Sequence, residues 1–180
     1  MWNEFKPAIR FVLMFVGLYL MGNLVYGLYI SSLGNTPDEI TDLVSGQSAW
    51  VLNNLLGYDV NAVLNSAGPT VFLKTGQRVV LNVYEGCNGI NVFIVFAAFI
   101  IAFSGSRRSA LWFIPLGILI LHACNLLRIA FLYWTAVNLQ RYFYYVHKYI
   151  FTAFIYAVVF VLWMIWVYQL DERRKIIAPQ

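Results

Sequence analysis

The length of the apolar runs constrains this chain more than any other feature of its sequence. Residues 11–30 form a run broken only by small or weakly polar side chains, and residues 149–170 form another. A helix of roughly 20 residues crosses the ~30 Å hydrocarbon core of a bilayer. Apolar residues make up 61% of the chain and charged residues 11%, against about a quarter charged in soluble domains. The sequence therefore predicts a small polytopic membrane protein, with residues 1–180 forming a single membrane domain.

The basic residues indicate how the chain is oriented. They occur in small groups beside apolar runs: Lys6 and Arg10, the turn 105–108 and the segment 171–175. Such groups are retained on the cytoplasmic side of a membrane. We interpret the net charge of +4 as a topology signal, without a nucleic-acid partner, and expect a multi-pass protein of the cell inner (cytoplasmic) membrane.

The predicted fold class is an all-α polytopic membrane protein, a helical bundle of four, or five, transmembrane spans with a small extracytoplasmic loop domain. The expected spans are about 9–30, 88–104, 110–128 (or extending to 138) and 149–170, and the extracytoplasmic loop is 31–86. The first run is longer than the 7–15 apolar residues of a typical signal peptide. We expect a retained anchor, with cleavage near 31–34 as the alternative. Residues 129–146 either extend the third helix, fold back as a re-entrant segment or lie flat on the membrane.

The loop 31–86 contains two kinds of local signal. Thr36 as N-cap, Pro37 at the first helical position and Glu39 three residues after the cap predict a helix start. Residues 71–73 and 78–84 are expected to form two short strands around a turn. The loop domain either binds a substrate or serves as a packing cap.

Three reactive side chains fall at one edge of the membrane in this topology. Cys87 stands at the outer end of the second span, Arg128 at the outer end of the third, and His147 at the outer end of the last. A thiol is an effective nucleophile when a nearby cation holds it as thiolate. Arg128 and His147 are the candidates for that role, although each also suits an interfacial anchor.

Other residues support or compete with these three. Asn125 shares a helix face with Arg128, and Glu85 either orients His147, pairs with Arg128 or is a simple loop charge. His122 lies about 9 Å deeper than Arg128. Cys124 is expected to be a packing residue, because the two cysteines are far apart and form no C-x-x-C pair.

These motifs resemble the exosortase/archaeosortase family of prokaryotic integral-membrane transpeptidases. The cysteine context E-x-C-x-G-I is matched by residues 85–90, the N-x-x-R-I context by residues 125–129, and the histidine opening a final span by His147. The family usually has Ser or Thr directly after the cysteine, where this chain has Asn88. The resemblance covers roughly residues 84–170.

The resemblance implies acyl transfer on exported proteins that carry a C-terminal sorting signal, made of a short motif, a transmembrane helix and a basic tail. Cys87 would be the nucleophile, Arg128 the oxyanion donor and His147 the proton donor, with Glu85, Asn88 and Asn125 in support. No metal or organic cofactor is required. Two other functions stay open: a non-catalytic membrane assembly or export factor, and a membrane thiol oxidoreductase that would need Cys124. An intramembrane serine protease is disfavoured, because no G-x-S-x-G element lies in a span.

Overall fold

The computed structural model describes residues 2–103 and 107–177, and the side chains of 5–103 and 108–169. Gly105 and Ser106, which begin the predicted basic turn, lie outside the described residues. The side chains of Arg107 and of the predicted basic segment 171–175 also lie outside them.

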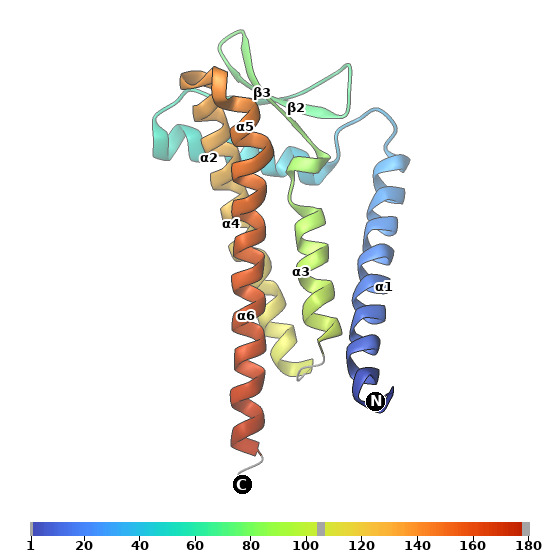
Figure 1. Cartoon of the computed structure of the whole chain (residues 1–180). Coiled ribbons are helices and arrows are strands. Elements are labelled where there is room, and N and C mark those ends of the chain that lie inside the picture. The colour runs from blue at the N-terminus through green and yellow to red at the C-terminus, as the bar shows by residue number, and fades with distance from the viewer. Residues whose placement is uncertain (1, 104–106, 178–180) are drawn as a thin grey trace.

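A helical bundle carries a small sheet at one end. Figure 1 shows α1, α3, α4 and α6 side by side, with the sheet and α2 at one end and the beginning of α1 and the end of α6 at the other. The longer helices are α1 (Trp2–Ser32), α2 (Glu39–Leu56), α3 (Ile90–Ala102), α4 (Arg107–Asn138) and α6 (Phe151–Ile177), with a short α5 (Phe143–Tyr145). The strands are β1 (Asn61–Leu64), β2 (Thr70–Thr75) and β3 (Arg78–Tyr84). Short helical turns occupy Glu85–Cys87, Gln140–Tyr142 and Val146–Ile150, the last of them π-helical.

Within the described residues, three helical segments are long and apolar enough to cross a membrane. They are Phe5–Ser32, Arg108–Asn138 and Gln140–Gln169. The predicted second span, 88–104, corresponds to α3, whose 13 residues extend about 20 Å at 1.5 Å per residue. That is less than the ~30 Å hydrocarbon core. The structure therefore supports a multi-pass membrane protein with three candidate spans and one shorter apolar helix beside them.

Helix α4 continues well past Arg128. Its 32 residues extend about 48 Å, which exceeds the ~30 Å core by several turns. The turns after Arg128 are buried beneath α2 and the sheet, where Ile129, Leu132 and Tyr133 have almost no exposed surface. The hydroxyl of Tyr133 is also hydrogen-bonded to that of Thr75 at the end of β2. The loop domain therefore packs against the end of α4.

The loop domain corrects one sequence prediction and extends another. Helix α2 is capped by Asp38 rather than Thr36, because the Asp38 carboxylate accepts the Thr41 N–H at 2.9 Å and satisfies a free donor of the first turn. Strands β2 and β3 confirm the two strands expected around the turn, and β1, which was not predicted, pairs with β2 and completes an antiparallel sheet in the order β1-β2-β3. Only β2 and β3 carry a clear strand pattern in the sequence.

Two apolar cores hold the molecule together. The core at the sheet end of the bundle joins α2, the sheet, Cys87 and the end of α4. The other core joins α3, α4 and α6 around Phe96, Leu121 and Trp166. Close contact of α3 with α4 requires Gly117, since a Cβ there would lie 2.2 Å from the Phe96 ring. Cys87 therefore lies within the core at the sheet end of the bundle.

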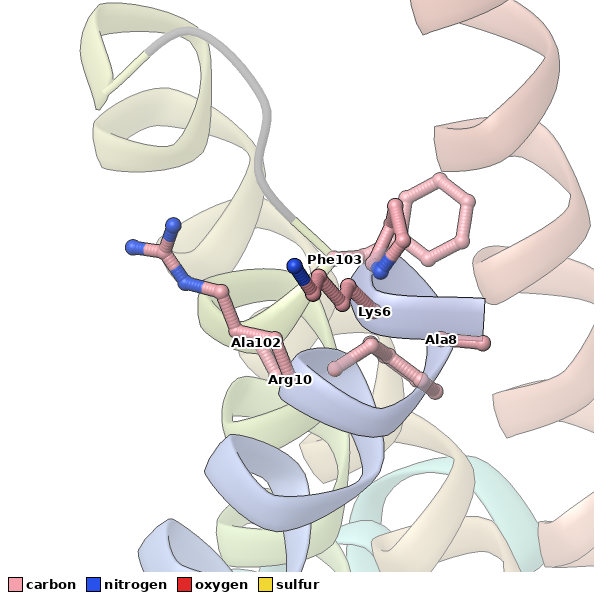
Figure 2. Close-up of a pocket in the computed structure, with 7 residues that line it drawn as sticks. Lys6, Ala8, Arg10, Ala102 and Phe103 are labelled. Carbon is pink, nitrogen blue, oxygen red and sulfur yellow. The ribbon is translucent and has the colours of Figure 1, made fainter. Parts of the chain in front are cut away.

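A cavity of about 590 Å³ lies at the opposite end of the bundle from the sheet. It is formed by the start of α1 and the end of α3, with Lys6, Arg10 and Phe103 in its wall. Figure 2 shows both cationic side chains beside it. The described residues in this wall include no cysteine, histidine or carboxylate.

Candidate active site

Cys87 is positioned by a tight connection between β3 and α3. The turn Glu85–Cys87 follows β3 directly, and Gly89 caps α3 with φ +90°, a conformation that side chains other than glycine rarely adopt. A Cβ at Gly89 would also lie 3.3 Å from the Asn125 side chain on α4. The second glycine of the motif therefore lets the cysteine turn approach α4 closely.

The thiol lies in the wall of a small cavity between the sheet and the helices. Cys87 is only 5% exposed. The cavity has a volume of about 230 Å³, and its walls are Val80, Leu81, Asn82, Val83, Cys87, Ile129, Leu132, Phe143 and His147. The structure thus brings the predicted nucleophile and the predicted proton donor, 60 residues apart in sequence, into one cavity.

Arg128 acts on this cavity from α4. Its positive charge interacts with Cys87, with Tyr84 and with the His147 ring. One guanidinium nitrogen, Nη1, donates to the Asn125 side-chain oxygen at 3.3 Å. Its Nε is buried and has no hydrogen-bond partner among the described residues. An unpaired buried donor is energetically costly, and a negatively charged oxygen in the site would satisfy it.

Asn125 connects the cysteine turn to the arginine. Its side-chain nitrogen donates to the Cys87 carbonyl oxygen at 2.9 Å, while its oxygen accepts from Arg128. The side chain is buried. Asn125, which was expected to help hold Arg128, therefore also holds the backbone of Cys87.

Opposing effects act on the ionisation of the Cys87 thiol. Burial raises its pKa above the ordinary value, and this effect prevails over the Arg128 charge, which lowers the pKa. The backbone N–H and the hydroxyl of Tyr84 also lower the pKa through hydrogen bonds to the sulfur, whereas the Glu85 carboxylate raises it. In the resting site the thiol is therefore mostly protonated near neutral pH.

Tyr84 is a site residue that the sequence reasoning missed. Its hydroxyl is hydrogen-bonded to the Cys87 sulfur, and the negative charge of the thiolate is the largest of the effects that raise the tyrosine pKa. The raised pKa keeps the hydroxyl protonated, so it remains a donor. The available signal was Gly86, where a Cβ would lie 2.3 Å from the Tyr84 ring. The glycine lets the ring fold over the turn toward the sulfur.

The two histidines occupy different surroundings. His147 lies in the π-helical turn Val146–Ile150 that begins the last span, and its ring stacks on Phe143 with centroids 5.9 Å apart. Such π-helical turns are often found at functional sites. His122 is hydrogen-bonded to the Gln47 side chain at 2.8 Å, and it is absent from the walls of the Cys87 cavity.

Asn88 and Glu85 are close to Cys87 in sequence but do not act directly with Arg128 or His147 in the described structure. The Asn88 side chain is buried and donates to the Tyr26 hydroxyl at 2.7 Å, joining the cysteine turn to α1. Its oxygen accepts the Ile90 N–H at 3.0 Å at the start of α3. Glu85 is half-buried, and in the described part of the chain it forms no ion pair with Arg128 or His147.

The remaining candidate groups are isolated. Cys124 is half-buried on α4, and neither it nor Cys87 forms a disulfide. Within 2–103 and 107–177 no cluster of three or more His, Cys, Asp or Glu side chains is arranged to hold a metal ion.

Comparison with known proteins identifies one family. The model of a family described as transmembrane exosortase matches residues 6–169, nearly the whole chain. No curated protein and no solved structure matches significantly.

Proposed function

The chain belongs to the transmembrane exosortase family, and from this premise we propose that it is a membrane cysteine transpeptidase. It cleaves the C-terminal sorting signal of exported proteins and transfers the shortened protein, through a thioester at Cys87, to an acceptor amine or to water. Family membership supports a membrane-bound, sortase-like processing role and suggests a cysteine peptidase or transpeptidase. The assignment of each chemical role to a residue is our own.

One observation carries this proposal. Cys87 and His147 line the same cavity, and the charge of Arg128, whose Nε has no partner among the described groups, acts on both of them. A nucleophile, a proton donor and a free oxyanion donor are what acyl transfer through a thiol needs. A non-catalytic assembly or export factor has no need for such a grouping at a buried position.

In the first half-reaction, His147 takes the proton of the Cys87 thiol and becomes an imidazolium. The resulting thiolate attacks the carbonyl carbon of the cleaved peptide bond and forms a C–S bond. The carbonyl oxygen becomes an oxyanion, which Arg128 stabilises by hydrogen bonding and charge. The C–N bond then breaks, and the leaving nitrogen takes a proton from the His147 imidazolium. The product is a thioester on Cys87 and a released C-terminal fragment.

In the second half-reaction, an acceptor amine or a water molecule attacks the thioester carbonyl. The nucleophile gives its proton to His147, the C–S bond breaks, and the Cys87 thiolate is restored. Atoms and charges balance over the cycle, and no redox change takes place. The proton then returns from His147 to the Cys87 sulfur, because burial raises the thiol pKa and favours the neutral form at rest. Ionisation for the next cycle depends on His147 as proton acceptor and on the charge of Arg128.

We place the active site on the extracytoplasmic face of the inner membrane. The basic Lys6 and Arg10 lie at the opposite end of the bundle from the cavity of Cys87, and the positive-inside rule assigns that opposite end to the cytoplasm. Exported proteins with a C-terminal transmembrane helix and a basic tail are the substrates that fit this orientation, because their tail would lie on the cytoplasmic side.

Cysteine substitution tests the proposal, with the second cysteine as a matched control. Cys87→Ser in the full chain should stop processing, so that membrane proteins with an intact C-terminal helix accumulate in cells. Cys124→Ser should process at close to the wild-type rate. Membrane proteomics of the two strains measures the uncleaved forms. Normal processing by a folded Cys87→Ser protein would refute the enzyme, and loss of processing in Cys124→Ser would favour dithiol chemistry instead.

A further inference from the structure

The strand that leads to Cys87 is at the edge of its sheet. The strand order β1-β2-β3 leaves one side of β3 without a partner strand. Four consecutive β3 residues, 80–83, line the cavity that also contains Cys87 and His147. The cavity thus runs along an open strand edge up to the nucleophile.

The register of the sheet fixes which backbone groups face this edge. In antiparallel pairs, hydrogen-bonded and non-hydrogen-bonded residue pairs alternate. The Thr70 carbonyl accepts the Asn65 N–H at 3.0 Å on the β1 side, so the backbone groups of the next residue, Val71, face β3. Val71 therefore forms a hydrogen-bonded pair with Val83. The following pair is non-hydrogen-bonded, and it directs the N–H and C=O of Asn82 away from β2.

The same alternation places the backbone of Tyr84 on the open side. The turn Glu85–Cys87 follows Tyr84 directly, and Cys87 lines the same cavity as residues 80–83, so the open edge ends beside the nucleophile. Asn82 lies two residues earlier, about 7 Å along a strand. The backbone of Asn82 forms no hydrogen bond outside the sheet with any described residue, and the register directs it away from β2.

We infer that the edge of β3 at Asn82 is the docking site for the substrate, which binds as an extended peptide pairing its backbone with β3. This inference rests on the proposed function. Backbone pairing with a sheet edge is a general mode of peptide recognition. In an extended segment, one residue can pair its backbone N–H and C=O with those of Asn82. A carbonyl about two residues further along that segment then reaches the Cys87 sulfur.

The surroundings limit the length and character of the bound segment. The register shift opposite Leu73 and Lys74 leaves Val80 as an extra residue on β3, and such a bulge interrupts regular pairing. The cavity, at about 230 Å³, is smaller than the roughly 300–1,000 Å³ of sites for drug-sized ligands. Apolar side chains predominate in its wall. The structure therefore favours a short segment with small apolar side chains.

Proline substitution tests the edge directly. Asn82→Pro removes an N–H that the sheet itself does not use, and proline is tolerated at edge positions of this kind. Leu64→Pro is the matched control, because Leu64 pairs with Val71 and so directs its N–H to the opposite free edge, on β1. Its side chain is 55% exposed. Asn82→Ala controls for the asparagine side chain.

The probe is the purified full chain treated with acetyl-Ala-Val-Ala chloromethyl ketone, which alkylates Cys87 with loss of chloride. Its rate is compared with that of iodoacetamide, which needs no docking. Asn82→Pro should slow labelling by the peptide roughly two- to tenfold, as expected for one lost hydrogen bond. The peptide rate of Leu64→Pro should match that of the wild type. The slowing in Asn82→Pro should exceed that in Asn82→Ala, which removes only the side chain. Equal peptide rates for Asn82→Pro and the wild type would overturn the inference.

A second measurement avoids any change to the protein. Peptide probes with an N-methyl group on the first, second or third amide should label wild-type Cys87 at rates that alternate with position, because only alternate residues of a strand face β3. Uniform rates would overturn the inference. The proposed function is judged separately: if processing in cells requires Cys87 but neither peptide result holds, the enzyme stands and the docking site is wrong.

Discussion

Three groups lower the pKa of the Cys87 thiol: a phenol, a backbone N–H and the charge of a guanidinium. The guanidinium belongs to Arg128 on α4, and both other donors belong to Tyr84. Gly86 allows the Tyr84 ring to lie over the turn, because any Cβ at that position would collide with the ring. The glycine before the cysteine thus has a physical role in shaping the donor set of the thiol.

Replacing Tyr84 by phenylalanine tests its contribution to the thiol. The hydroxyl lowers the Cys87 pKa from a value that burial has raised, so Tyr84→Phe should raise the pKa further. Only the thiolate is alkylated, and its fraction grows as pH rises through the pKa. The alkylation profile with iodoacetamide should therefore move to higher pH, with slower reaction near neutrality. Tyr145→Phe, an exposed tyrosine outside the cavity, is the control. A profile that stays in place, or moves to lower pH, would show that the hydroxyl does not act on the sulfur.

Among individual residues, the charged and nucleophilic groups were recognisable in the sequence, whereas the arrangement of the side chains around them was not. Cys87, Arg128 and His147 could be predicted because each opens or closes an apolar run in a recognisable context. Tyr84 could not, because its role depends on a ring folding across a glycine. The direction of Asn88, buried toward Tyr26 on α1, also follows only from the tertiary packing.

The elements differ from expectation in length more than in kind. Helix α3 begins at Ile90 and ends at Ala102, so it is shorter than the run 88–104. It begins late because Gly89, with its positive φ, turns the chain into the helix. Helix α4 continues to Asn138 because its last turns find an apolar partner in the loop domain. Burial of these turns is a tertiary effect, and the aromatic residues of 129–146 alone did not distinguish it from an interfacial segment. Strand β1 likewise forms through its pairing with β2, which is a tertiary effect.

The contact between α4 and the sheet has a measurable strength. Tyr133 is buried and its hydroxyl is hydrogen-bonded to Thr75, so Tyr133→Phe should destabilise the loop domain by about 0.5–1.5 kcal/mol, the net value of one hydrogen bond. Thr75→Val should have a similar effect, and the double variant should add little to either. Hydrogen exchange of β2 and β3 amides in detergent measures the change. Additive losses would show that the two hydroxyls do not act as a pair.

In the whole molecule, the membrane bundle and the loop domain meet at the site. Cys87 enters from the sheet, Arg128 from the middle of α4 and His147 from the start of the last span. The multi-pass character was evident from composition and run length, whereas the sheet edge beside Cys87 was not. An edge becomes visible only when the strand order is known. We therefore attribute the chemistry to a pattern readable in the sequence, and substrate docking to the fold.

The central claim is that Cys87 carries a covalent acyl intermediate. The direct measurement is intact-mass analysis and peptide mapping of the full chain purified from its own membranes, before and after hydroxylamine, which cleaves thioesters. We predict a hydroxylamine-sensitive adduct on Cys87 that ends in the new C-terminus of a shortened protein, more abundant when the acceptor is depleted and absent from Cys87→Ala. An unmodified Cys87, in cells that are processing substrate and lack acceptor, would contradict covalent catalysis at this residue.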